Sequence, residues 1–405
     1  MRFVVESAPL ASDEDRAMDV PLMTLRQITS DLGQKLLSEI SEAPWGATSI
    51  RPIEAIYGAI GTHCGAQRKR NEDRSLFAQI CTADRELLNV AAVCDGVGGS
   101  QRGDEAAAIA IVKLVELLTR KNRSSTLAQF VPGLIHKMDD AIRDALGGAG
   151  TTTASIIITS THGDFAAVNI GDSRIFSWRL GKDPIQISVD DTLENELRDL
   201  NFKDASVLDA HGLRGSLSQA LGQSGSRSSD LRVSVINSDR FAGGGAILAS
   251  DGAWKGSESG FFAIAKHATS PAEMIRRSLA LAAWTGDLDN ASIFAIRDIS
   301  VLMDHQKSPA RSVQDCADVA VWFCDAKLVL KASVSQAPQL LSEKGKGSDV
   351  APKSQNKKRA RRKIVAEDND DRQQRFAEEQ TSGRKNREVR PLVQVSSEDV
   401  PSAKE

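Results

Sequence analysis

Four aspartates stand at or just beyond the ends of predicted strands, at Asp73, Asp95, Asp251 and Asp289. The strands of one β-sheet core can bring such positions to a common edge, so we expect the four carboxylates to lie close together. Like charges raise one another's pKa at a dry site, and divalent cations are the simplest relief. Because the set holds oxygen donors and no His or Cys, Mg²⁺ or Mn²⁺ is expected rather than zinc. Two such ions about 3.5–4 Å apart can share a water and lower its pKa until it becomes a nucleophile.

The segment Arg68–Asp73 adds a phosphate-binding group to this predicted site. Arg68 can hold two phosphate oxygens with its planar guanidinium, and Glu72 adds a further carboxylate. A phosphoryl group is therefore the expected substrate. Asp172 is expected to turn toward the same site. The alternatives are a solvated charge cluster at 68–73, an ordinary glycine turn after Asp95 and a strand-end turn at Asp172.

Apolar runs that stop at an aspartate predict the elements that position the site. Val90–Cys94 is read as a buried strand ending at Asp95, where Gly96 lets the main chain approach a ligand. Ala246–Ser250 repeats this pattern before Asp251. Further strands are predicted at 56–62, 75–80, 151–161, 165–178, 231–236 and 291–296. Helices are predicted at 21–40, 104–120, 127–146, 193–200, 260–267 and 271–284.

Composition divides the chain into four segments. Residues 1–50 form an extension with one amphipathic helix, explained more simply by packing on the next domain than by partner binding. Residues 51–299 form the main domain, and 300–336 a short C-terminal extension with a strand or short helix at 319–330. The charged tail 337–405 is expected not to order by itself. Its basic block, 357–363, is either a solvated tail or a contact for nucleic acid or an acidic partner.

Overall composition excludes several classes of protein. The chain has 405 residues and is 41% hydrophobic, enough for a sizeable core. Its net charge of −3 gives no field that would attract nucleic acid or an anionic membrane to the whole chain. The five cysteines form no C-x-x-C pair and read as reduced thiols. With no secretory pattern and no apolar stretch near the ~20 residues of a membrane helix, we expect a cytoplasmic protein without a membrane partner.

Seven short motifs follow one another along residues 55–298. They are Arg68-x-x-Asn-Glu-Asp73, Asp95-Gly96-x-Gly98-Gly99, Gly150-Thr-Thr, Gly171-Asp-Ser-Arg174, Ser218-Gln-Ala-Leu-Gly222, Ser250-Asp-Gly252 and Asp289-Asn290. In this order and spacing they resemble the metal-dependent protein phosphatases of type 2C, the PPM family, in a bacterial-like form. Seven motifs in register are far more specific than one glycine-rich loop.

The resemblance implies an α+β fold, an αββα four-layer sandwich of two antiparallel β-sheets flanked by helices. It implies hydrolysis of phosphoserine or phosphothreonine in a phosphoprotein, a target of a Ser/Thr kinase, by direct attack of a metal-activated water. Two Mn²⁺ or Mg²⁺ ions would be bridged by Asp95. The Gly96 carbonyl would bind one of them, and Asp251 and Asp289 would hold the other.

The resemblance also assigns the remaining site residues. Arg68 would hold the phosphate, whereas Glu72 and Asp73 would act mainly through metal-bound waters. Many members of the family place an acidic residue near position 255, where it helps the counterpart of Asp172 hold a third ion. Lys255 stands there in this chain, so two ions are expected rather than three.

Two other functions compete with hydrolysis. The first is a catalytically weak signalling module that uses the same fold to bind a phosphorylated partner. Lys255 favours it, whereas the four aspartates and Arg68 favour the enzyme. The second is an adaptor that acts through the basic block 357–363. No oligomeric state is predicted.

Overall fold

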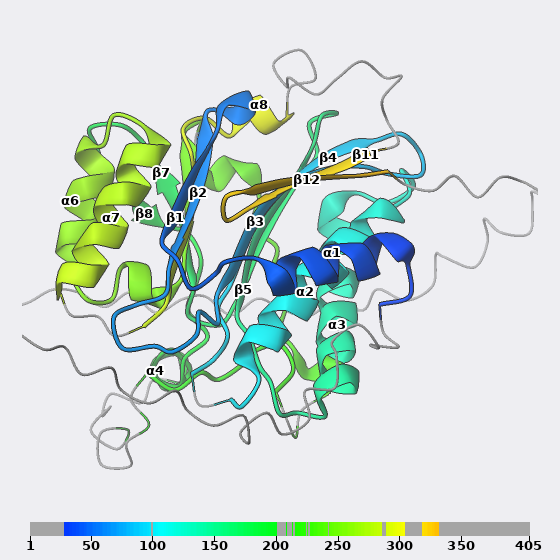
Figure 1. The fold of residues 1–405 in the computed structure, drawn as a ribbon, viewed down its shortest axis with the longest axis horizontal. Helices are drawn as coiled ribbons and strands as arrows, with labels where there is room; N and C mark the ends of the chain where they lie inside the picture. Colours follow the sequence, from blue (N-terminus) through cyan, green and yellow to red (C-terminus); the bar gives the residue numbers. More distant parts are fainter. Residues whose placement is uncertain are drawn as a thin grey trace, which may run out of the picture. The chain divides into compact units, whose positions relative to one another are not determined.

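Two six-stranded antiparallel sheets form the centre of the protein (Figure 1). The computed structural model describes residues 28–331 except 99, 201–207, 209–212, 214, 224, 226, 242, 286–288 and 304–317. The first sheet has the order β1-β2-β10-β9-β7-β8 and the second β12-β11-β3-β4-β5-β6. The strands are β1 Ser49–Ile53, β2 Gly58–His63, β3 Arg74–Cys81, β4 Leu87–Cys94, β5 Ala154–Ser160, β6 Phe165–Ile170, β7 Arg174–Trp178, β8 Ile185–Gln186, β9 Gly245–Ala249, β10 Ala291–Ile296, β11 Asp318–Phe323 and β12 Ala326–Lys331.

Helices cover the outer face of each sheet, which confirms the predicted αββα sandwich. In Figure 1, α6 and α7 lie outside the first sheet, and α1, α2 and α3 lie outside the second. The α-helices are α1 Asp31–Glu42, α2 Gly103–Thr119, α3 Leu127–Leu146, α4 Leu193–Asp199, α6 Glu258–His267, α7 Pro271–Thr285 and α8 Ser300–Met303; short 3-10 turns are η3 Glu54–Ile56, η4 Ser228–Asp230, η5 Ser238–Phe241 and η6 Asp251–Ala253.

Strand β4 shows how one sequence serves two cores. Val90, Ala92 and Cys94 point into the core under α2 and α3, whereas Ala91 and Val93 point into the core between the sheets. Side chains alternate across a strand, so a continuous apolar run is required when both faces are buried. The predicted buried strand ending at Asp95 is therefore confirmed.

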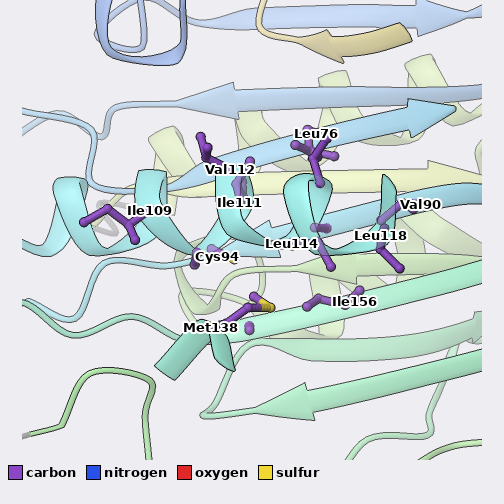
Figure 2. Packing of buried hydrophobic residues seen from close by; sticks show 14 of the residues in the cluster. Leu76, Val90, Cys94, Ile109, Ile111, Val112, Leu114, Leu118, Met138 and Ile156 are labelled. Carbon is purple, nitrogen blue, oxygen red and sulfur yellow. The ribbon is translucent and has the colours of Figure 1, made fainter. Parts of the chain in front are cut away.

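Helix α2 is the helix packed most deeply against the second sheet. Asp104 and Glu105 lie in its first turn, where carboxylates complement the helix dipole. Its apolar side chains meet β3 and β4 on one side and α1 and α3 on others (Figure 2). Burial on more than one side explains why the helix is apolar almost all round.

Helix α1 begins later than predicted. The described residues start at 28, and Ser30 caps the helix by accepting a hydrogen bond from the Gly33 amide at 3.1 Å. A side-chain cap of this kind fixes a helix start more sharply than periodicity does. The Ser30 amide donates to the fully buried Glu116 of α2 at 3.0 Å. Together with Leu36 and Leu37, this contact fixes α1 to the helix layer, and it favours packing over partner binding.

The predicted strand 165–178 is instead two strands in different sheets. Strand β6 belongs to the second sheet and β7 to the first, and residues 171–173 cross between them. Gly171 has φ +96°, and a Cβ there would lie 2.7 Å from Thr153 Cγ2. The crossing therefore needs glycine. The pattern of apolar residues does not indicate which sheet a strand joins. Periodicity therefore could not predict the break between β6 and β7.

One further prediction is wrong, and another is confirmed in one of its two forms. Residues 231–236 do not form a strand, because only Ile236 makes a bridge, to Ala167. The segment 318–331 forms the β11–β12 hairpin, and β11 pairs with β3 to extend the second sheet. The main sheet thus continues past residue 299. The predicted tail, with its block at 357–363, lies outside the described residues.

Two general features agree with expectation within the part of the chain that the structure describes. None of its helices combines the length and apolar character needed to cross a membrane. Its cysteines, Cys64, Cys81, Cys94 and Cys324, are buried and form no disulfide.

The α2 core makes a simple prediction about stability. Leu114 is fully buried, so Leu114→Ala should lower the free energy of unfolding by about 2–5 kcal/mol, through lost transfer energy and a cavity. Urea unfolding measures this. Leu180→Ala, at a leucine that is 54% exposed, should change it by less than about 0.5 kcal/mol. Equal effects at the two positions would contradict the packing described.

Candidate metal centre

A cavity of about 430 Å³ opens where ends of both sheets meet. Asp95 follows β4 of the second sheet, whereas Asp251 and Asp289 flank β9 and β10 of the first. The charged residues that line the cavity are Arg68, Asp95, Asp172, Asp251, Lys255 and Asp289. Five of the eight predicted site residues therefore share one cavity. Glu72, Asp73 and Gly96 are not in its lining.

The end of β4 holds Asp95 through its main chain. The Asp95 amide donates to Thr153 Oγ1 at 3.0 Å, and its carbonyl accepts from the Thr153 amide at 2.8 Å. A Cβ on Gly96 would lie 2.5 Å from the carbonyl carbon of Gly103 and 2.9 Å from Glu72 Cβ. Glycine therefore lets this turn pass between the start of α2 and the loop that carries Glu72.

Asp73 lies inside the protein and is fully buried. Its Oδ2 accepts a hydrogen bond from Ser250 Oγ at 2.8 Å, whereas its Oδ1 is buried with no partner. Burial, with a further contribution from the charge of Asp251, raises the pKa of Asp73 to about 7. An orphaned carboxylate oxygen of this kind calls for a positive charge or a proton.

The other carboxylates crowd one another. Burial raises the pKa of Asp95 well above its ordinary value, and the charges of Asp73, Asp251, Asp172 and Asp289 add to the effect. Burial and the charge of Asp251 likewise raise the pKa of Asp172 to about 7. Like charges held this close favour protonation or a bound cation.

Arg68 reaches into the same cavity. Its Nη2 lies 2.7 Å from Asp289 Oδ2, and both side chains are about one-third exposed. A Cβ on Gly98 would lie 2.8 Å from Arg68 Nη2, so glycine leaves the space that the guanidinium occupies. A partly exposed guanidinium beside a group of carboxylates is suited to a phosphate that those carboxylates would otherwise repel.

Asn290 joins the two halves of the site. Its Oδ1 accepts from the Glu72 amide at 2.7 Å, and its Nδ2 donates to the carbonyls of Cys64 and Arg70 at 2.5 and 3.1 Å. The residue stands directly after Asp289 in sequence. Sequence reasoning gave it no role. The only signal was an amide, with both donors and acceptors, next to a predicted ligand.

Arg174 fixes the crossing segment that carries Asp172. Its guanidinium donates to both carboxylate oxygens of Asp190 and to Glu258, and it stacks 3.4 Å above the ring of Trp254. An ion pair stacked on an aromatic face gives the side chain little freedom. Asp172 is thereby held at the wall of the cavity.

The donor set fits a hard divalent cation. Every charged side chain here that could bind a metal is a carboxylate. The unpartnered Oδ1 of Asp73 is one of the available ligand atoms. Among the described residues, no three His, Cys, Asp or Glu side chains stand ready to share one ion. Asp289 is paired with Arg68, and Asp251 with Lys255 Nζ at 2.9 Å. Side-chain cations thus neutralise two carboxylates that an ion would otherwise contact.

Comparisons with known proteins agree with this geometry. The family model described as protein phosphatase 2C matches residues 60–206. The fold is that of a bacterial serine phosphatase, with 17% identity, a TM-score of 0.50 and coverage of 60% of this chain and 98% of that chain. It is also that of the serine/threonine phosphatase Stp1 from Staphylococcus aureus, with 16% identity, a TM-score of 0.50 and coverage of 60% and 95%.

A third solved structure is similar over a comparable length. It is the catalytic domain of the serine threonine protein phosphatase PstP in complex with two manganese ions, with 22% identity, a TM-score of 0.45 and coverage of 62% of this chain and 100% of that chain. No curated protein matches the sequence.

The raised pKa values predict how stability depends on pH. Between the ordinary value of 3.8 and about 7, folded Asp73 and Asp172 hold protons that the unfolded chain releases. The metal-free protein should therefore lose stability as the pH rises from about 4 to about 7. Urea unfolding with chelator at pH 5 and pH 8 measures this. Asp73→Asn should reduce the difference, and an unchanged difference in that variant would contradict the assignment.

Gly98→Ala tests the placement of Arg68. The new Cβ would push the mobile end of Arg68 and no backbone atom, so the unfolding temperature should hold while phosphate binding weakens. Losing a charged hydrogen bond predicts roughly a tenfold higher dissociation constant for inorganic phosphate. Gly133→Ala, in open space, is the control. Wild-type affinity in Gly98→Ala would mean that Arg68 does not bind the phosphate.

Proposed function

We propose that this chain is a protein-serine/threonine phosphatase of the protein phosphatase 2C family and that it works by a water that two divalent cations activate. The observation that carries this proposal is the cavity in which Arg68 meets the carboxylates of Asp95, Asp172, Asp251 and Asp289. Carboxylates alone would repel a phosphate. The same carboxylates, neutralised by cations and accompanied by a guanidinium, would attract one.

Mn²⁺ and Mg²⁺ are the cations proposed, because the donors are oxygens. Asp95, the Gly96 carbonyl, Asp251 and Asp289 would hold them, with Glu72, Asp73 and Asp172 close by. When bound, the ions supply a water of lowered pKa as nucleophile and neutralise charge on the phosphoryl group. Lys255 Nζ pairs with Asp251, and its charge also acts on Asp172. Because this ammonium group already supplies positive charge beside Asp172, we expect two ions rather than three.

The protein's own residues orient the substrate. Arg68 holds the phosphoryl oxygens, and Gly98 leaves room for its guanidinium. Holding a phosphoryl group in line with its nucleophile removes much of the entropic cost of the reaction. Positive charge from Arg68 also stabilises the negative charge on the equatorial oxygens in the transition state.

The substrate proposed is a phosphoserine or phosphothreonine side chain of a protein phosphorylated by a Ser/Thr kinase. The cavity is open enough to admit such a side chain, since Arg68 and Asp289 are each about one-third exposed. The competing signalling module would only bind phosphorylated partners. No observation favours it beyond Lys255 and the absence, among the described residues, of three side chains ready to share one ion. An adaptor role of the block 357–363 stays a prediction, since those residues lie outside the described part of the chain.

Asp251→Asn and a chelator test the proposal together. Wild-type protein should release phosphate from a phosphoserine peptide with Mn²⁺ or Mg²⁺ and stop when EDTA is added. Asp251→Asn keeps the size of the side chain and removes its charge. We expect more than about a hundredfold loss of turnover, since even outer partners of a metal are worth 10–100-fold.

The matched control is Asp183→Asn, at an exposed aspartate paired with Lys266 on the surface. It should leave turnover unchanged, and neither variant should lower the unfolding temperature of the chelated protein. Failure of the wild type to turn over with either ion, in protein that binds the ion, would reject the proposed function.

A further inference from the structure

The loop that carries Glu72 and Asp73 is held by a buried arginine. Arg74 begins β3 and is 6% exposed. Its Nη1 donates to the carbonyl of Asn71 at 2.6 Å and to that of Asp73 at 2.8 Å. One guanidinium nitrogen therefore binds the main chain before and after Glu72 and fixes the shape of the loop.

Trp45, which follows α1, contacts both ends of this loop. Its ring lies 4.7 Å from Arg74 Cζ, and its carbonyl accepts from Asn71 Nδ2 at 3.0 Å. Asn71 Oδ1 in turn accepts from the Asp73 amide at 3.0 Å. Trp45 is 5% exposed, and its indole N–H donates to the carbonyl of Ile40 at 2.7 Å. The indole is thus fixed to the last turns of α1.

The C-terminal hairpin supports the same tryptophan. The Phe323 ring stacks on the Trp45 ring with centroids 6.2 Å apart and planes inclined by 19°. Phe323 ends β11, which pairs with β3, the strand that Arg74 begins. Arg51 of β1 donates to the carbonyl of Asp325 in the hairpin turn. Segments from both sides of the main domain therefore meet at the loop that carries Glu72 and Asp73.

The contact between Trp45 and Arg74 has an electrostatic reason. Arg74 is buried, and its Nε has no hydrogen-bond partner. A cation removed from water gains most from the face of an indole ring. The ring face supplies the favourable interaction that Nε lacks, and it keeps Arg74 in the one position from which it reaches both carbonyls.

We propose that Trp45 is a positioning residue for the metal centre: α1 and the β11–β12 hairpin hold its ring against Arg74, and Arg74 holds the loop that carries Glu72 and Asp73. Residues 31–45 and the hairpin 318–331 are then part of the catalytic unit. This inference rests on the proposed function, because the loop matters through the ions it helps to bind.

The test compares Trp45→Leu with Trp45→Phe in the full chain. Leucine keeps an apolar side chain and removes the ring face, whereas phenylalanine keeps a face for Arg74. Two quantities are measured: the dissociation constant of Mn²⁺ by titration calorimetry without substrate, and hydrogen exchange of a peptide spanning residues 71–74 in chelated protein. The second needs neither metal nor activity.

Trp178→Leu is the matched control. Trp178 is 1% exposed, donates its indole N–H to the carbonyl of Ala265 at 2.7 Å and lies 5.5 Å from Arg297 Cζ. Trp178 lies under α6, in the hydrophobic core on the outer face of the first sheet. Like Trp45, it is a buried tryptophan that hydrogen-bonds a helix carbonyl and lies near an arginine. Its replacement should lower the unfolding temperature and leave both Mn²⁺ affinity and exchange at 71–74 unchanged.

For Trp45→Leu we expect about tenfold weaker Mn²⁺ binding, the usual effect of losing an outer support, and faster exchange at 71–74. Trp45→Phe should restore most of both. Unchanged values in Trp45→Leu, or equal changes in Trp178→Leu, would overturn the proposal. If Trp45→Leu does not fold, Arg74→Lys takes its place, because it keeps the charge and loses the planar fork. If the wild type binds no Mn²⁺, the proposed function fails, and exchange alone decides the role of Trp45.

Discussion

Mutual repulsion among buried carboxylates is the constraint on which the rest of this structure depends. Asp73, Asp95 and Asp172 all have raised pKa values because burial and neighbouring negative charge act together. No single strand or helix could hold such a group, because each carboxylate would turn outward to water. The sandwich prevents this by delivering the carboxylates from ends of different strands, with the hydrophobic cores of both sheets behind them.

Hydrogen bonds from neutral amides and hydroxyls connect the segments that form the site. Asn290 ties the Asp289 turn to the Glu72 loop, and Asn71 ties that loop to Thr62 of β2 at 2.7 Å. Ser250 joins Asp73 to the main chain of Ser292. These groups satisfy buried donors and acceptors without adding charge to a site that already has too much of one sign. A metal could then change the charge of the cavity without changing the backbone around it.

The predicted αββα sandwich is confirmed, but the sheet that each strand joins could not be read from the sequence. A strand that stops at Asp-Gly, as at Asp95 and Asp251, is a local signal, and it led to the residues that share the cavity. The break between β6 and β7 at Gly171 has no such signal, because sheet membership is decided by distant pairing partners. A strand or a short helix was predicted at 319–330, but the pairing of the hairpin with β3 could not be predicted, for the same reason. Asn290 and Arg174 stand in two of the motifs, but their contacts, like those of Trp45, join residues far apart in sequence, and spacing does not reveal such contacts.

The crossing at residues 171–173 has a mechanical consequence. Three linking residues give four Cα–Cα steps, which reach about 13–14 Å when fully extended, and packed sheets lie about 10 Å apart face to face. The connection from β6 to β7 therefore has only a few ångströms of slack. If the two sheets slid past one another at this end, residues 171–173 would become fully extended and would displace Asp172. A link this short limits relative motion of the two sheets at this end, where Asp172 lies in the wall of the cavity.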